Sequence, residues 1–344
     1  MYKKYTKKKI IKVISTKSNS KTFKNTKSSS LLIGCHASTV PSVLDGIKYV
    51  ESIGGNSLQI YLGATKSADL KMKTKFTPEE MNEIKSYVTK RHITLIIHSI
   101  YLLNFCSFPP SSGRIKYAHN NLQHDLKYGS MIGAKCVVLH LGFKKDLTME
   151  EALQNLISNV NHIVRHMPKD IMLSLETSAG TGSQFGYSLE SLELLWKGIR
   201  HNNRSGKDGK YGSVRRVGFC IDTAHIFVSG YDISKVEGDN SIKSYLYRFN
   251  KLIGWKNIIN FHINDSRYPL GARKDEHRGI GSGLIYNTDE GKKALKYIKK
   301  FCMSRKIPMI LETHGAGSAK KDDNKGSHKG AYGYEYEIGM IKEL

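Results

Sequence analysis

The chain has 344 residues, of which 39% are hydrophobic and 24% are charged, so it can bury a core and is not disordered as a whole. Lysine and arginine total 54 against 30 aspartates and glutamates, and the formal charge of +24 favours a polyanionic partner. No run of about 18 apolar residues occurs, which argues against a membrane-spanning helix.

Residues 1–30 form the first distinct segment. They contain ten lysines and no acidic residue, with many serines, threonines and asparagines. This composition predicts a flexible arm, because it cannot bury enough apolar surface to order itself. An import signal, a nucleic-acid tether and a leader without a specific role all fit it. Residues 31–344 keep a charge of +14, and we expect them to form one catalytic domain.

From residue 31 onward, short apolar runs alternate with stretches that have helical spacing. The runs predict strands at Leu31–His36, Ser57–Leu62, Ile93–His98, Cys136–His140, Ile171–Glu176, Val217–Asp222, Ile258–His262 and Pro308–Glu312. The spacing predicts helices at Pro41–Ile53, Pro78–Lys90, Ile115–Met131, Met149–Met167, Leu189–Ile199, Ile242–Ile253 and Gly291–Arg305. Thr77 precedes Pro78, Glu79 and Glu80, which together make a favourable helix start.

Eight continuous apolar strands alternating with helices predict an α/β fold, a single (β/α)8 TIM barrel, because both faces of its sheet are covered. The alternative is an open doubly wound sheet. Such a sheet normally carries a glycine-rich phosphate turn after its first strand, and GCHAS at 34–38 is not such a turn. Two basic stretches, Asn202–Arg216 and Lys320–His328, are expected to be exposed loops.

Five cysteines are scattered along the chain without a CxxC pair, at Cys35, Cys106, Cys136, Cys220 and Cys302. Their odd number and scatter are typical of free thiols in a reducing, intracellular compartment; nucleus, cytoplasm and virion all remain open. A cysteine-based zinc site is not expected. Any metal must therefore be held by histidine and carboxylate side chains.

Most of the predicted strands end in, or lead directly into, a side chain that can bind a metal: His98, His140, Glu176, Asp222, His262 and Glu312. His225, Asp275 and His277 lie in the loops just beyond, and His36 ends the first strand. In a (β/α)8 barrel the carboxyl ends of the strands meet at one rim, so we expect these side chains to face each other. His36 is expected to support a ligand rather than to be one.

The residue types indicate metal-assisted hydrolysis. Clustered carboxylates repel one another, whereas interleaved imidazoles and divalent cations relieve that repulsion. Mixtures of histidine, aspartate and glutamate suit zinc, manganese or iron, and nine ligands supply three ions if one carboxylate bridges two of them. The basic body points to a phosphodiester in nucleic acid as the substrate. No motif for covalent acyl transfer is present.

At these residues the chain resembles the endonuclease IV family, the zinc-dependent class of apurinic/apyrimidinic (AP) endonucleases. The resemblance runs through nearly the whole body, in short segments that each follow a predicted strand. They are GCHAS at 34–38, HSIYLLN at 98–104, HLG at 140–142, LETSAGTGS at 175–183, CIDTAHIFVSGYD at 220–232, HINDS at 262–266, RKDEHRGIGSG at 273–283 and LET at 311–313.

The resemblance implies three zinc ions per chain. The first would be held by His98, His140 and Glu176, the second by Glu176, Asp222, His262 and Glu312, and the third by His225, Asp275 and His277. Glu176 would bridge the first two ions, with a hydroxide between them as the nucleophile. Glu312 would orient or deprotonate that nucleophile, and the third ion would stabilise the leaving 3′-oxygen.

The family also implies a function in DNA repair. Its members flip an abasic nucleotide out of double-stranded DNA and hydrolyse the phosphodiester 5′ to it, leaving a 3′-hydroxyl and a 5′-deoxyribose phosphate; they also clear 3′-blocking groups. Tyr101 is expected beside the flipped sugar, and Lys66 and Arg273 are expected at the DNA backbone. The loop Gly63–Leu70 departs from the family pattern, because it lacks the arginine and the aromatic residue that enter the DNA stack.

Two other functions are considered. A sugar isomerase or epimerase of the related metal-dependent barrels would need fewer ligands and no basic surface. A basic nucleic-acid-binding barrel that has lost catalysis would not need the full ligand set. We expect a monomer, because no oligomerisation signal is visible.

Overall fold

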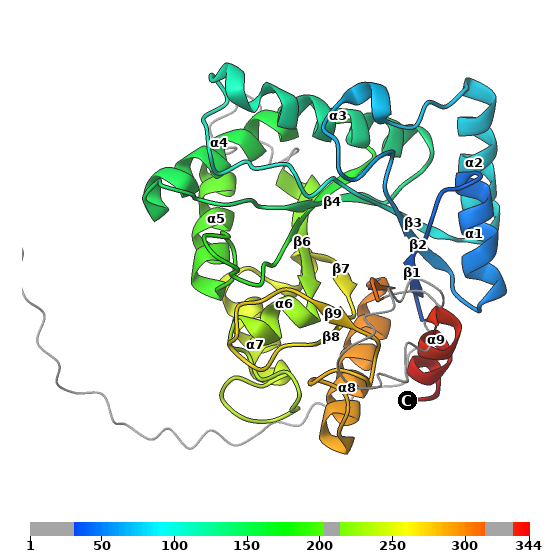
Figure 1. The fold of residues 1–344 in the computed structure, drawn as a ribbon, viewed down its shortest axis with the longest axis vertical. Helices are drawn as coiled ribbons and strands as arrows, with labels where there is room; N and C mark the ends of the chain where they lie inside the picture. Colours follow the sequence, from blue (N-terminus) through cyan, green and yellow to red (C-terminus); the bar gives the residue numbers. More distant parts are fainter. Residues whose placement is uncertain (1–30, 203–213, 314–332) are drawn as a thin grey trace, which may run out of the picture.

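The computed structural model describes residues 31–202, 214–313 and 333–344. Within them, eight parallel strands close into a barrel in the order β1-β10-β7-β6-β5-β4-β3-β2 (Figure 1). The strands are β1 (Ile33–His36), β2 (Ser57–Ile60), β3 (Thr94–His98), β4 (Cys136–His140), β5 (Met172–Glu176), β6 (Val217–Asp222), β7 (Ile258–His262) and β10 (Met309–Leu311). The predicted (β/α)8 barrel is confirmed, and the doubly wound alternative is wrong because the sheet is closed.

Helices surround this barrel. They are α1 (Val43–Ser52), α2 (Pro78–Arg91), α3 (Lys116–Met131), α4 (Met149–His166), α5 (Leu189–Asn202), α6 (Thr223–Val228), α7 (Ile242–Leu252), α8 (Asp289–Arg305) and α9 (Tyr334–Glu343). Helices α1 and α2 lie on one side of the barrel and α5 on the opposite side, with α3 and α4 between them (Figure 1). Among the described residues, no helix combines the length and the apolar composition needed to cross a bilayer.

Local sequence signals set several helix starts. Thr77 accepts from the backbone N–H of Glu80, whose side chain accepts from the backbone N–H of Thr77, so the expected capping at α2 is a complete capping box. Thr148 and Glu151 form the same arrangement at α4. Helix α1 begins two residues later than predicted, because Ser42 caps it and leaves Pro41 outside.

Two apolar layers position the mouth of the barrel. The larger lies between the strands and the helices, and the smaller fills the barrel interior with Ile96, Cys136, Val138, Cys220, Ile259 and Ile310. Two buried polar contacts cross this interior: Ser174 Oγ donates to Asn260 Oδ1 at 2.7 Å, and Asn260 Nδ2 donates to Cys220 Sγ at 3.0 Å. All five cysteines are free and buried, as expected.

The loops above the strands contain elements that the pattern did not predict. A short antiparallel pair, β8 (Asp265–Ser266) and β9 (His277–Arg278), follows β7. Helix α6 follows β6 directly, and α9 packs against β1. The predicted arm at 1–30, most of the basic stretch 202–216 and the stretch 320–328 lie outside the described residues.

Candidate metal centre

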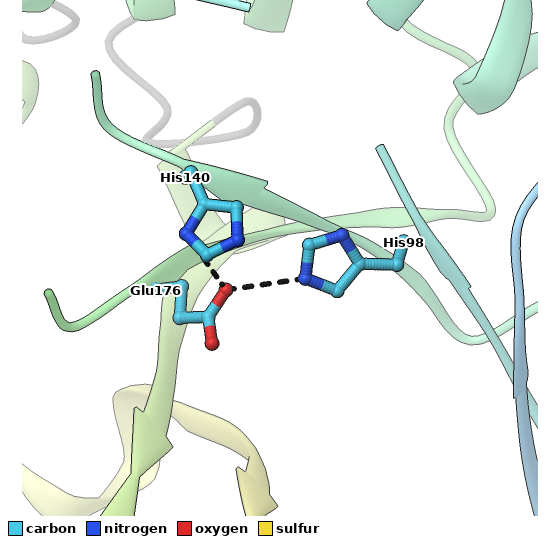
Figure 2. Close-up of side chains that lie close together, drawn as sticks. All are labelled: His98, His140 and Glu176. Atoms are coloured by element: carbon cyan, nitrogen blue, oxygen red, sulfur yellow. Dashed lines mark hydrogen bonds and ion pairs between the residues drawn. The ribbon is translucent and has the colours of Figure 1, made fainter. Parts of the chain in front are cut away.

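Three side chains at the ends of neighbouring strands form the first group. Figure 2 shows one carboxylate oxygen of Glu176 facing both His98 and His140. Glu176 Oε2 lies 3.2 Å from His98 Nε2 and 3.3 Å from His140 Nδ1. The strand register explains the meeting, because His140 on β4 pairs directly with Glu176 on β5. All three ligand atoms lie close enough to bind one cation.

The second group shares Glu176 with the first. Glu176 Oε1 lies 2.8 Å from His262 Nδ1, which is also 3.0 Å from Glu312 Oε2 and 3.8 Å from Asp222 Oδ2. Asp222 and His262 are register partners on β6 and β7, and Glu312 directly follows β10. These four side chains form a cluster with ligand atoms within bonding reach of a common ion.

The third group lies toward the loop after β7. Asp275 carboxylate oxygens lie 3.1 Å from His225 Nε2 and 3.3 Å from His277 Nε2. Asp222 is also close, with Oδ2 at 3.7 Å from His277 Nε2, and the ligand atoms of Asp222, His225 and His277 all lie within 4.8 Å of one another. The structure thus brings Asp275 to both imidazoles and adds Asp222, which the resemblance assigns to the second group.

Several imidazoles have their rear nitrogen held by an oxygen acceptor. His98 Nδ1 donates to the Ser99 carbonyl at 2.7 Å, and His225 Nδ1 donates to the Thr177 carbonyl at 2.7 Å. His262 Nε2 donates to Gln59 Oε1 at 2.9 Å. Each contact keeps a hydrogen on the rear nitrogen and turns the other nitrogen toward the carboxylates. This is the arrangement that metal-binding histidines adopt.

Burial and charge act against each other on these groups. Burial lowers the pKa of His140 to about 4, so this imidazole is neutral at pH 7. Burial also acts to lower the pKa of His277, but the carboxylates of Asp222 and Asp275 raise it to about 9. Burial acts to raise the pKa of Glu176, whereas His140 and His262 hold it well below its ordinary value. Glu176 therefore stays ionised and favours positive charge on neighbouring imidazoles, whereas burial raises the pKa of Asp222.

The residues present fit divalent cations. Nε2 of His225 and Nε2 of His277 are buried and make no hydrogen bond of acceptable geometry, although Asp275 lies within 3.3 Å of both. Nitrogens and carboxylate oxygens that converge without hydrogen-bonding one another are placed as ligands of a common ion. The donor set consists mainly of imidazole and carboxylate, with Cys220 beside Glu176 and His262 in one candidate group, and it suits zinc, manganese or iron.

The centre opens into a cavity of about 350 Å³ at the barrel mouth. Its lining consists of His36, Tyr61, His98, Tyr101, His140, Glu176, His225, Asp275, His277, Glu312, Thr313 and Tyr334. None of these lining residues is a lysine or an arginine. The cavity therefore offers aromatic walls and anionic ligands, and histidine is the source of positive charge among its described lining residues.

The structure also places the other predicted site residues. Tyr101 lines the cavity, is 46% exposed, and accepts a hydrogen bond from Gln184 Nε2 at 3.1 Å. The guanidinium of Arg273 lies 4.6 Å from the ring centre of Tyr187. Lys66 is exposed in the loop after β2. His36 Nδ1 is 3.8 Å from Glu312 Oε1 and 3.1 Å from Gln59 Nε2, so it touches a predicted ligand from behind.

Sequence reasoning missed several residues that support the centre. Asn264 Nδ2 donates to Asp222 at 2.7 Å, and its Oδ1 accepts from the Glu312 backbone N–H at 2.9 Å. Gln59 holds His262 and Glu312. A neutral amide inside an apolar strand was the available signal for Gln59, since such a group needs buried partners. Asn264 lies between β7 and β8 and offered no such signal.

Helix α9 brings two further residues to the centre. Tyr334 lines the cavity, and the carboxylate of Glu337 accepts from the Ile280 N–H at 2.9 Å and from Thr313 Oγ1. Burial raises the pKa of Glu337 to about 7. No local pattern could place these two residues, because the chain returns to β1 from a distant part of the sequence.

Comparison with known proteins identifies the class of barrel first. The family model described as "Xylose isomerase-like TIM barrel" matches residues 47–343. This match covers most of the chain, so the protein belongs to that class of barrels.

Individual relatives narrow the class. A Shouchella clausii protein named "Probable endonuclease 4" is 31% identical over 319 residues, which span 91% of this chain and 97% of that protein. An endonuclease 4 relative from Acanthamoeba polyphaga mimivirus is 30% identical over 286 residues, 82% of this chain and 85% of that protein. The crystal structure of endonuclease IV from Thermus thermophilus shares the fold, with a TM-score of 0.66 at 19% identity over 91% of this chain and 99% of that one. The chain belongs to the endonuclease IV family and is a nuclease.

Proposed function

We propose that the protein is a DNA-repair AP endonuclease with three zinc ions. It hydrolyses the phosphodiester 5′ to an abasic site in double-stranded DNA, leaves a 3′-hydroxyl and a 5′-deoxyribose phosphate, and removes 3′-blocking groups. The observation that carries this proposal is the convergence of three overlapping histidine–carboxylate groups at one barrel mouth, with the imidazoles turned inward by their rear hydrogen bonds.

Each of the three ligand groups would hold one cation. His98, His140 and Glu176 would hold the first, Glu176, Asp222, His262 and Glu312 the second, and His225, Asp275 and His277 the third. Bound divalent cations supply Lewis-acid polarisation of a phosphate and a nucleophile at neutral pH. Glu176 is placed to serve both of the first two groups, because its two oxygens face different histidines: Oε2 faces His98 and Oε1 faces His262.

The contacts of Glu312 support a role in proton transfer. Its side chain is 14% exposed at the cavity, whereas that of Glu176 is 1% exposed, so Glu312 can meet water that enters from the mouth. Oε1 accepts from Gln59 Nε2 at 2.6 Å, which fixes the carboxylate, and Oε2 faces the ligand group. We assign Glu312 to accept the proton of the attacking water and to orient that water.

The walls of the cavity fit a flipped sugar phosphate. Tyr61, Tyr101 and Tyr334 supply aromatic surface above the ligands, and an abasic nucleotide has no base that would need further room. Tyr101 would pack beside the flipped sugar. Lys66 and Arg273 would approach backbone phosphates, and the basic charge of the chain strengthens this attraction at low salt.

One assay tests the proposal. A duplex oligonucleotide with a single tetrahydrofuran abasic analogue should be cut on the 5′ side of the analogue, and prolonged incubation with a strong chelator should abolish incision. Added zinc should restore it. Metal-dependent turnover of ketose sugars without incision would instead favour the isomerase alternative. DNA binding without incision by zinc-loaded protein would favour an inactive barrel.

A further inference from the structure

Gln59 lies inside the barrel wall with a fully buried side chain. It belongs to β2, between the apolar residues Leu58 and Ile60, and its exposure is 0%. Burying an amide is unfavourable unless its donors and acceptor are all satisfied. The contacts of this one side chain therefore explain why a glutamine stands in an apolar strand.

All the polar atoms of the Gln59 amide contact residues of the metal centre. Nε2 donates to Glu312 Oε1 at 2.6 Å and faces His36 Nδ1 at 3.1 Å. Oε1 lies 2.9 Å from His262 Nε2. The opposite amide orientation would place Oε1 against the Glu312 carboxylate, with two acceptors facing each other. The hydrogen-bond network thus determines which atom is the nitrogen.

This orientation has a direct consequence for His262. Because Oε1 can only accept, the hydrogen of this contact resides on His262 Nε2. Nδ1 is then the nitrogen that can offer a lone pair, and it is the one that lies 2.8 Å from Glu176 and 3.0 Å from Glu312. In His98 and His225 the tautomer is set by a hydrogen bond to a main-chain carbonyl, which substitution cannot remove. In His262 the corresponding hydrogen bond goes to the Gln59 side chain, which substitution can remove.

Glu312 is held by the same amide. Gln59 takes up Oε1, and Asn264 Nδ2 approaches Oε2 at 3.3 Å, so the carboxylate cannot rotate without losing its short contact to Gln59. Both ligands that Gln59 touches belong to the second group. His98 and His140 of the first group have no hydrogen bond to it among the described contacts.

We infer that Gln59 is a positioning residue that sets the tautomer of His262 and the orientation of Glu312, and thereby determines cation affinity at the second group. This inference rests on the proposed metal centre. Partners of this kind typically change metal affinity by about 10–100-fold when removed. Gln59 is fully buried and is not among the residues that line the cavity, so we expect its substitution to change kcat rather than KM.

The test uses the full chain with zinc and cobalt ions as probes. Gln59→Leu keeps similar bulk and removes all three contacts. Competition against a chelator should show one class of zinc site weakened roughly 10–100-fold, with the remaining sites unchanged. The cobalt-substituted variant should show an altered visible absorption spectrum, and its incision should lose kcat at unchanged KM.

Gln184→Leu is the matched control. Gln184 is also a buried glutamine near the mouth, but its amide contacts Tyr101 and Thr181 rather than a ligand. This variant should keep the zinc affinities and the cobalt spectrum of the parent protein. Parent-like zinc affinity and an unchanged spectrum in Gln59→Leu would overturn the inference, and so would equal weakening of every site.

The two proposals can fail separately. If the parent protein binds zinc as described but does not incise abasic DNA, the proposed function fails, whereas weakened zinc binding in Gln59→Leu would still support the role of Gln59. If the parent incises and Gln59→Leu binds zinc like the parent, the role of Gln59 fails and the proposed function stands.

Discussion

Two clusters of buried charge in this protein are neutralised in different ways. On the flank of the barrel, Lys73 Nζ lies 2.9 and 3.1 Å from the two carboxylate oxygens of Asp125, with side chains 2% and 0% exposed. At the mouth, four carboxylates face imidazoles, and among the described residues no lysine or arginine lines the cavity. On the flank, the lysine of the chain itself neutralises the buried carboxylate. The mouth instead pairs its carboxylates with imidazoles, whose protons divalent cations can replace, and such a cluster of perturbed groups marks a functional site.

The largest expected effect comes from removing the shared carboxylate at the mouth. Glu176→Ala takes a ligand from two groups at once, so we expect loss of bound zinc and a fall in incision of at least about 1,000-fold. Elemental analysis and the abasic-oligonucleotide assay measure both. Glu190→Ala, at an exposed ion pair with Arg248, should behave like the parent. Incision by Glu176→Ala at the parent rate would remove the proposed function.

On the flank, removing one member of the buried Lys73–Asp125 pair should lower stability without changing zinc binding. Lys73→Met leaves the buried Asp125 with only His124 Nδ1, at 3.4 Å, as a basic neighbour, which should lower the free energy of unfolding by about 3–5 kcal/mol. Urea denaturation measures this change. The double variant Lys73→Met/Asp125→Leu should recover most of the loss, and both variants should bind zinc like the parent. Loss of bound zinc from either variant would contradict the claim that the flank pair has only a structural role.

Substitution in the third metal group should reduce incision less than substitution of Glu176, which the first two groups share. Asp275→Ala removes the carboxylate between His225 and His277 but leaves Glu176 in place. We expect the variant to retain part of its zinc and to lose most of its incision, roughly tenfold or more. Asp289→Ala, at a carboxylate 93% exposed, is the matched control. Three zinc ions per chain in Asp275→Ala would contradict this assignment.

A last effect, on stability alone, concerns Glu337, a buried carboxylate that accepts hydrogen bonds from the Ile280 N–H and from Thr313 Oγ1. Burial raises its pKa from 4.5 to about 7, so between these values the folded chain holds a proton that the unfolded chain releases. Stability should therefore fall as pH rises from 4.5 to 7, by about 2–3 kcal/mol. Denaturant unfolding at pH 5 and pH 8 should show this fall for the parent but not for Glu337→Gln. Equal falls in both proteins would exclude Glu337 as the source.

The contrast between flank and mouth also explains what the sequence could predict. The strand ends were visible because histidines and carboxylates in apolar runs are rare, and parallel strands bring their carboxyl ends to one rim. The barrel was visible because its strands are continuously apolar. Most predicted helix boundaries fall within two residues, and capping side chains such as Ser42 account for the shift at α1.

The remaining features depend on three-dimensional neighbours. Gln59 and Asn264 are neutral amides, and nothing local shows that their partners are ligands rather than main-chain groups. The pairing of Lys73 with Asp125 joins residues 52 positions apart. Tyr334 and Glu337 reach the centre from α9, which the alternating pattern did not include. The DNA-contacting positions of Lys66 and Arg273 stay predictions.

The carboxylate of Asp265 gives the loop after β7 an internal anchor. It accepts from the main-chain N–H groups of Ser266, Gly281, Gly283, Ile285 and Tyr286 at 2.7–3.3 Å. Gly283 passes so close that a Cβ would lie 2.4 Å from Asp265 Oδ1. The two ends of the segment that bears Asp275 and His277 are thus held together at the Asp265 carboxylate. The third metal group is therefore pre-organised before a cation binds, and the cation's affinity is not reduced by the conformational entropy lost on ordering the loop.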